Sequence, residues 1–354
     1  MKSDINLLFL YLLLVTACSG NNGEKLLWQE VENLPEPVSN NAVASVAVDE
    51  NHFLYSFMGL SEGKTYKDIH SKAFKYNIKK NTWRSIENVP GDSGRLAATA
   101  ATVNGKIYIF GGYTVAEDGS EVSVPDVYLL DPLNDDFSLI SKMPVPVDDA
   151  VSLVYKDRYI YLISGWHNND NVNNVQIFDT QNLQWQQATP FPGAPVFGHA
   201  GGIAGNKIVI TDGVKIVEGE KEGERSFTMS TESWLGVIEN NSITEINWKK
   251  MPEHPGYARY RMAAIGDGER IIFAGGSSNP YNYNGIGYNG EPAVPDSSIF
   301  AYSLKDSAWQ ELATAPVATM DHRSLIKTGD WYYLVGGMLN QQEVSNRVFR
   351  FKLE

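Results

Sequence analysis

Six polar residues stand just before short runs of small apolar residues along the chain: Asn41, Arg95, Asp149, His199, Arg261 and Arg323. We call this set the predicted polar ring. Half of its members are arginines, although the chain has a net charge of −13. A guanidinium binds a carboxylate through two parallel hydrogen bonds, so the ring is expected to bind an anionic group. The alternative is an internal salt-bridge network, in which Asp148 and Asp149 compensate the arginines without a ligand.

Loops that follow apolar strands add further candidates for ligand binding. The loop over residues 277–295 is rich in tyrosine and asparagine, with Tyr283 among them. Such side chains combine flat apolar area with hydrogen bonding, which suits sugars. An acidic loop ends in Glu224 and Arg225, and the stretch 166–170 contains one carboxylate. A metal ion is not expected there, because one carboxylate is few for calcium. The alternative for each loop is a solvated surface.

A repeated pattern predicts the elements that position these residues. Six apolar strands end in glycine, at Gly59, Gly112, Gly165, Gly213, Gly276 and Gly337. An aromatic residue follows each of the first five in turn: Trp83, Phe137, Trp185, Trp248 and Trp309. Units of about 50 residues with this composition are typical of propeller blades. Blades one, three and four lack the full Gly-Gly pair.

No aromatic of this kind follows Gly337, but an unpartnered one, Trp28, stands near the start of the chain. The N-terminal strand is therefore expected to complete the last blade, which removes two exposed sheet edges. We predict an all-β fold, a six-bladed β-propeller over residues 26–354, closed by the N-terminal strand. In a four-stranded blade, the loop before the first strand and the loop after the second share one face. The predicted polar ring should then converge on the mouth of the central channel.

These markers resemble the kelch family over nearly the whole chain. The stretch Ile272–Gly276 and the Asn/Tyr/Gly-rich loop after it resemble the bacterial sialic acid mutarotases, also called N-acetylneuraminate epimerases. That family has a glutamate directly after the fourth-blade glycine, where this chain has Val214. Arg225 corresponds to the family's arginine, and Glu222 or Glu224 would substitute for the missing glutamate.

The resemblance implies an isomerase that acts on an acidic sugar without a cofactor. Mutarotation needs a base for the anomeric hydroxyl and an acid for the ring oxygen, and His199, Asp149 and Glu224 are the candidates. Arg95, Arg225, Arg261 and Arg323 would bind the carboxylate, with Asn41 and Tyr283 as further ligand-binding residues. The alternative is a non-catalytic kelch module that binds a glycan or a protein partner at the cell envelope.

Composition and the first residues predict where the protein acts. Its acidic charge argues against nucleic acid and against docking on anionic lipid. Lys2 precedes the apolar run 5–17, which is short for a membrane span. The run ends in Leu-Val-Thr-Ala before Cys18, the only cysteine, and so resembles a bacterial lipobox. We expect a signal peptide over 1–17, lipidation of Cys18, a tether over 18–25 and sorting to the outer membrane. The alternative is an ordinary signal peptide.

Overall fold

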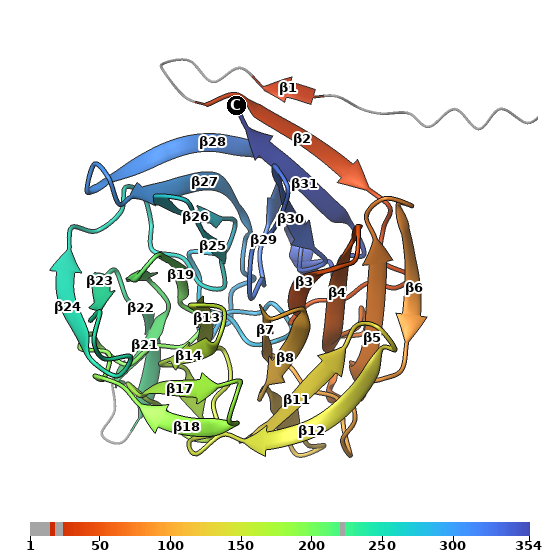
Figure 1. The fold of residues 1–354 in the computed structure, drawn as a ribbon, viewed down its shortest axis with the longest axis horizontal. Coiled ribbons are helices and arrows are strands. Elements are labelled where there is room, and N and C mark those ends of the chain that lie inside the picture. The colour runs from red at the N-terminus through yellow and green to blue at the C-terminus, as the bar shows by residue number, and fades with distance from the viewer. Residues whose placement is uncertain (1–14, 18–23, 220–223) are drawn as a thin grey trace, which may run out of the picture.

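A computed structural model describes residues 15–17, 24–219 and 224–354, and its strands form a closed ring of six blades (Figure 1). Each blade is an antiparallel sheet whose first strand lies nearest the axis. Blade one consists of β3 (Ala42–Val48), β4 (Asn51–Leu60), β5 (Ile69–Asn77) and β6 (Thr82–Ile86). Blade two consists of β7 (Thr99–Val103), β8 (Lys106–Phe110), β11 (Asp126–Asp131) and β12 (Asp136–Lys142). Blade three consists of β13 (Val151–Tyr155), β14 (Tyr159–Ile163), β17 (Val175–Asp179) and β18 (Gln184–Gln187).

The last three blades repeat this order, and the outer strand of the sixth blade comes from the start of the chain. Blade four consists of β19 (Ala200–Ala204), β20 (Lys207–Thr211), β23 (Ser233–Ile238) and β24 (Ile246–Met251). Blade five consists of β25 (Ala263–Asp267), β26 (Arg270–Ala274), β27 (Asp296–Ser303) and β28 (Ala308–Thr319). Blade six consists of β29 (Ile326–Thr328), β30 (Trp331–Val335), β31 (Val348–Leu353) and β2 (Leu26–Val31). The prediction of a six-bladed, all-β propeller is confirmed.

Closure occurs where the sequence predicts it. Strand β2 pairs antiparallel with β31, and Trp28 lies opposite Phe351. The indole packs against Phe349 and Phe351, with ring centroids 5.2 and 5.8 Å away. A short strand, β1 (Val15–Ala17), pairs with the outer edge of β2. Since β2 links the two ends of the sequence in one sheet, the ring closes without a disulfide.

The core is divided into clusters that lie between neighbouring blades. One cluster joins Tyr55 of blade one to Ile109 of blade two, and another joins Trp28 of blade six to Ile272 of blade five. The aromatic residues predicted to follow the glycine-ended strands all lie on fourth strands. Each blade thus buries both of its faces against its neighbours, as propeller blades do.

Glycine allows each blade to bring two backbone segments together at the loop face. At Gly112 φ is +82°, and an added Cβ would lie 2.6 Å from the Leu96 carbonyl oxygen. Gly337 repeats this with φ +86° and the Met320 carbonyl oxygen at 2.6 Å. The close approach pairs a residue three to six positions before each inner strand with the residue directly after the glycine of each blade. Both sets of loops therefore share one face, as predicted.

That face carries additional hairpins, which form a cap over the ring. They are β9 (Tyr113–Val115) with β10 (Glu121–Ser123), β15 (Trp166–His167) with β16 (Asp170–Asn171), and β21 (Val214–Glu218) with β22 (Arg225–Met229). Two short 3-10 turns, η1 (Tyr66–Asp68) and η2 (Asn340–Gln342), complete the secondary structure of the described residues. Among these residues, no helix has the length and apolar character needed to cross a membrane.

Candidate functional site

Six residues at one structural register surround the axis on the loop face. We call them the axial ring: Asn40, Ala97, Asp149, Gly198, Arg261 and Asp321, each with φ between 48° and 69°. Their backbones are linked in sequence around the axis. Four consecutive links run from N–H to carbonyl: Ala97 to Asn40 (3.2 Å), Asp149 to Ala97 (3.0 Å), Gly198 to Asp149 (2.9 Å) and Arg261 to Gly198 (2.8 Å).

The ring closes through a side chain. Between the last and the first blade, the backbone N–H of Asn40 donates to a carboxylate oxygen of Asp321 over 2.9 Å. Asp149 and Arg261 hold the register expected for the predicted polar ring. The other four predicted residues do not, since Asn41, Arg95, His199 and Arg323 lie one or two positions away from ring members. The prediction of a common register is corrected accordingly.

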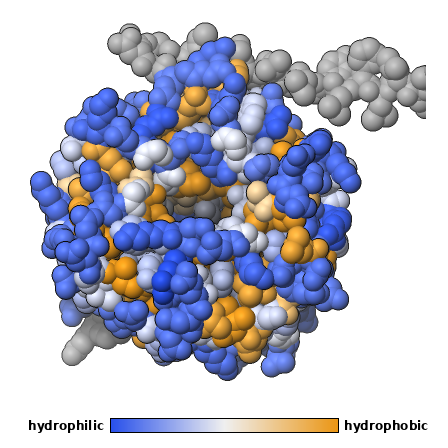
Figure 2. Space-filling view, viewed as in Figure 1, coloured by the Kyte–Doolittle hydropathy of each residue, from blue (hydrophilic) through white to orange (hydrophobic). Residues whose placement is uncertain are grey.

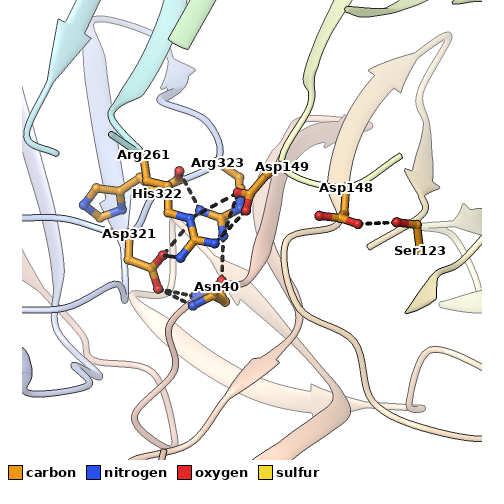
Figure 3. A network of polar contacts seen from close by, with 8 residues as sticks. All are labelled: Asn40, Ser123, Asp148, Asp149, Arg261, Asp321, His322 and Arg323. Carbon is orange, nitrogen blue, oxygen red and sulfur yellow. Dashed lines mark hydrogen bonds and ion pairs between the residues drawn. The ribbon is translucent and has the colours of Figure 1, made fainter. Parts of the chain in front are cut away.

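Two arginines and two aspartates form a buried ion network on the ring (Figure 3). Arg261 donates from Nε and Nη2 to the two carboxylate oxygens of Asp149, over 3.2 and 2.6 Å. Its Nη1 donates to Asp321 over 3.2 Å. Arg323 lies 3.1 Å from Asp149 and 3.4 Å from Asp321, and it donates to the amide oxygen of Asn40. The side chains of all four charged residues are at most 4% exposed.

This network is the internal salt-bridge alternative for Arg261 and Arg323, but with Asp321 in place of Asp148 as the second carboxylate. Burial alone would raise the pKa of Asp149, but Arg261 and Arg323 hold it below its usual value. The Arg261 guanidinium also lies over the rings of Tyr260 and Tyr281, 4.5 and 5.2 Å from their centroids. Its donors and its π faces are therefore occupied by the protein itself.

The remaining members of the predicted polar ring make separate contacts. Arg95 donates to the Gly111 carbonyl and to Asp126, each over 3.3 Å. Asn41 donates to the Ser56 hydroxyl over 2.8 Å. His199 is buried, and its ring nitrogens make no well-oriented hydrogen bond within the described residues. Burial lowers the pKa of His199 to about 4, so its imidazole is neutral at pH 7.

A cavity of about 210 Å³ lies on the loop face, between the axial ring and the hairpins. Its walls are largely aromatic, and its polar lining is rich in carboxyl groups. It is lined by Tyr113, Glu121, Asp148, Asp149, Trp166, Phe197, Phe227, Arg261, Asn282 and Tyr288. Clefts for drug-sized ligands measure roughly 300–1,000 Å³, so this one suits a single small ring. The aromatic wall is held together by ring contacts among its own members, Trp166, Phe197, Phe227 and Tyr288.

Two carboxyls in this cavity, Asp148 and Glu121, have raised pKa values, whereas the pKa of the ion-paired Asp149 is lowered. Burial raises the pKa of Asp148 well above its usual value, and the neighbouring Asp149 charge raises it further. The Ser123 hydroxyl lies 2.6 Å from one Asp148 oxygen (Figure 3). Glu121 is open to solvent at the rim, yet partial burial also raises its pKa, an effect that Arg261 opposes and Asp149 reinforces. Adjacent carboxyls with opposite pKa shifts are a common feature of acid–base sites.

The predicted loop residues lie at or near the cavity rim. Arg225 is 43% exposed, pairs with Asp170 over 3.5 Å and lies 5.8 Å from the Trp166 ring centroid. Glu224 is exposed, beside residues 220–223, which are not described. Tyr283 is half-buried, and after burial the charge of Glu121 is the next cause that raises its pKa. Cys18 lies outside the described residues.

A second cavity, about 300 Å³, is the central channel itself. All six inner strands line it, and Arg323 lies at its boundary with the ion network. Figure 2 shows the ring hollowed at its centre, with mostly apolar or weakly polar residues around the opening. The ion network thus separates the channel from the loop-face cavity. Among the described residues, no group of three His, Cys, Asp or Glu is placed to hold a metal ion.

Comparison with known proteins identifies the repeat. The family described as the KLHDC2/KLHL20/DRC7 kelch-repeats domain matches residues 20–213, more than half of the chain. The chain belongs to the kelch-repeat family. The fold of this kelch propeller is similar to the solved structure titled "Structure of YjhT", with a TM-score of 0.70 and 16% identity over 90% of this chain and 95% of that one.

Two kinds of protein are similar to this kelch propeller in sequence. The N-acetylneuraminate epimerase of Salmonella arizonae is 21% identical, over 86% of this chain and 85% of its own length. Epimerase 1 of Escherichia coli O6:H1 is 24% identical, over 84% and 88%. The human Kelch domain-containing protein 1 is 22% identical, over 76% and 68%. The chain is therefore a kelch β-propeller that resembles sialic acid mutarotases at low identity.

Proposed function

We propose that this kelch propeller binds a sugar in the loop-face cavity and interconverts its anomers. The observation that carries the proposal is the pair of carboxyls Asp148 and Glu121, which line a cavity with aromatic walls and form no ion pair with a described residue. Aromatic side chains offer flat faces to a sugar ring, and the carboxyls supply proton donors and acceptors. The similarity to proteins named N-acetylneuraminate epimerase supports a sugar as the ligand.

The chemistry needs one group that gives a proton and one that takes it. Asp148, whose pKa is raised by burial, would donate a proton to the ring oxygen of the sugar. Glu121, which has no ion-pair partner among the described residues, would accept the anomeric hydroxyl proton. The bond from the anomeric carbon to the ring oxygen then breaks, and a carbonyl forms. Rotation and re-closure, with the protons returned, give the other anomer, so no cofactor is consumed.

The residues first expected to be catalytic are less suited to these roles. Both oxygens of Asp149 accept from Arg261, and a second arginine lies beside them. His199 is a neutral, buried imidazole with its pKa near 4, which makes it a weak base. Glu224 is exposed, lies directly before β22 and is not among the residues that line the cavity.

A further question is which arginine could bind the carboxylate of an acidic sugar. The resemblance implies an acidic sugar. Arg261 and Arg323 are held by Asp149 and Asp321. Arg225, which is partly exposed beside Trp166, is the arginine best placed to receive a carboxylate. An acidic sugar would therefore bind with its carboxylate at the rim of the cavity.

The proposal is tested by following anomer interconversion by NMR after one pure anomer is dissolved. The protein should accelerate the exchange, and Asp148→Asn should lower the acceleration by about 10²–10⁴-fold while sugar binding persists. Glu121→Gln should have a comparable effect. Full acceleration by both variants would rule out this acid–base pair.

The alternative is a non-catalytic kelch module that binds a glycan or a protein. Exposed apolar side chains on the cap favour it: Val122 is 55% exposed on β10, Val217 is 37% exposed on β21, and Val294 is 65% exposed. Contiguous exposed apolar patches mark docking sites, and Val122 is the chain neighbour of Glu121 in the cavity lining. Binding without any acceleration of anomer exchange would support this alternative.

We also propose that the protein is exported to the outer membrane of the cell envelope and anchored there by a lipid on Cys18. The support is the short apolar run that ends in small residues before the sole cysteine. Cell fractionation tests this proposal. Cys18→Ala should move the protein out of the membrane fraction, and unchanged membrane association would contradict it.

A further inference from the structure

The charges at the floor of the loop-face cavity cancel within the protein. Arg261 and Arg323 carry two positive charges, and Asp149 and Asp321 carry two negative charges. Each arginine contacts both aspartates. The floor therefore has no spare positive charge with which to attract a carboxylate.

Apart from two tyrosines, the remaining ionisable groups that line the cavity are carboxyls. Arg261 is the only cationic side chain among the lining residues that the structure describes. Asp148 and Glu121 add two carboxyls with no matching cation. Glu121 is available for a ligand, because it forms no ion pair with any described residue and lies on β10 at the rim.

The aromatic wall adds a second preference for positive charge. Trp166, Phe197 and Phe227 lie edge to face or tilted around one side, with centroids 5.4–6.0 Å apart. Phe227 also stacks on Tyr288, at 4.2 Å. Aromatic faces attract cations within about 6 Å of the ring centroid, most strongly where water is excluded. Aromatic walls combined with carboxylates are the usual environment for a bound ammonium group.

We propose that the loop-face cavity is selective for a sugar carrying a free amino group, bound as an ammonium between Glu121 and the aromatic wall. This inference rests on the proposed function, since it assigns the substrate class of the same cavity. An acidic sugar is disfavoured, because Arg225 at the rim is already paired with Asp170 and the floor has no free cation. Its carboxylate would also approach Glu121 and Asp148. A neutral sugar fits the walls but lacks the attraction to Glu121.

The test is calorimetric titration of the mature protein at about pH 6.5 with three sugars that differ in charge: glucosamine, N-acetylglucosamine and N-acetylneuraminate. Glucosamine should bind about tenfold more tightly than N-acetylglucosamine, and N-acetylneuraminate should bind most weakly. Glu121→Gln should reduce the advantage of glucosamine to roughly onefold. Glu117→Gln, an exposed change on the same hairpin, is the matched control and should leave it unchanged.

The outcomes separate this inference from the proposed function. Tightest binding of N-acetylneuraminate would overturn the inference but leave a sugar-binding cavity intact. An advantage for glucosamine that survives in Glu121→Gln would also overturn it. Failure of all three sugars to bind would overturn both proposals.

Discussion

Replacing Arg261 by alanine should destabilise the propeller strongly. The guanidinium is 2% exposed, donates twice to Asp149 and once to Asp321, and lies over two tyrosine rings. Its removal leaves two buried carboxylates with only Arg323 to compensate them. Breaking a buried ion pair in this way costs about 3–5 kcal/mol.

The expected change in melting temperature follows from the size of the domain. At about 2.1 cal/mol/K per residue, roughly 330 residues give an unfolding entropy near 0.7 kcal/mol/K, so the loss corresponds to about 4–7 °C. Differential scanning calorimetry of the unmodified and variant proteins at one scan rate measures it. Adding Asp149→Asn to Arg261→Ala should recover part of the loss, because one uncompensated charge is removed.

Arg225→Ala is the matched control, since this arginine is 43% exposed and pairs with an exposed aspartate. It should cost less than about 0.5 kcal/mol, which is below 1 °C here. A melting temperature for Arg261→Ala that stays within about 1 °C of the unmodified protein would refute the structural role of the network.

Three further changes probe other parts of the molecule. Because the pKa of Asp148 is raised in the folded state, its contribution to stability is full below the ordinary carboxyl pKa and is lost as pH rises through the raised value. Unfolding in guanidinium chloride should therefore show Asp148→Asn gaining stability relative to the unmodified protein as the pH rises above about 4, and a difference that does not change with pH would contradict the shift. Gly337→Ala should cost roughly 1–3 kcal/mol more than Gly329→Ala, whose added methyl meets open space, and equal melting temperatures would contradict the close approach at Gly337. Trp28→Ala should cost about 3–5 kcal/mol and speed proteolysis of the N-terminal strand, whereas unchanged resistance would argue against closure through β2.

The fold was predictable because its signals recur at each blade. Six glycine-ended strands and the displaced aromatic Trp28 each report the same repeat, so an error in one unit does not change the conclusion. Even where Met58, Ser164 and Asp212 replace the first glycine, φ stays between 54° and 65°. The surrounding blade imposes this conformation whether or not the residue favours it.

The axial ring was predicted less well, because its register was judged from the start of each small apolar run. The structural marker is instead the residue that bridges to the glycine-ended strand. Aligning Leu96, Phe197, Tyr260 and Met320 at that position gives the ring members directly, Asp321 included. A shift of one or two residues exchanges a buried ion-paired side chain for one with separate contacts.

The cavity could not be derived from the repeat, because its walls belong to insertions of different length. Glu121 carries no sequence signal, since it lies on a short strand, β10, of a hairpin whose length and sequence differ from those at the same place in blades three and four. Asp148 was noticed only as a neighbour of Asp149. Its raised pKa depends on burial beneath the cap, a property of the folded loops rather than of the local sequence.

The closing strand also determines how the chain could be rewired. The backbone N–H of Lys25 donates to the Glu354 carbonyl over 2.7 Å, and the Glu354 N–H donates back to the Lys25 carbonyl over 2.9 Å. Within the folded ring these two residues are neighbours, as the ribbon in Figure 1 shows for the sheet that holds them. A peptide linker could join them, and new termini could be opened in the segment between β18 and β19. In such a circular permutant every blade would be formed by one continuous stretch of chain. No blade would then need a strand from the opposite end of the sequence.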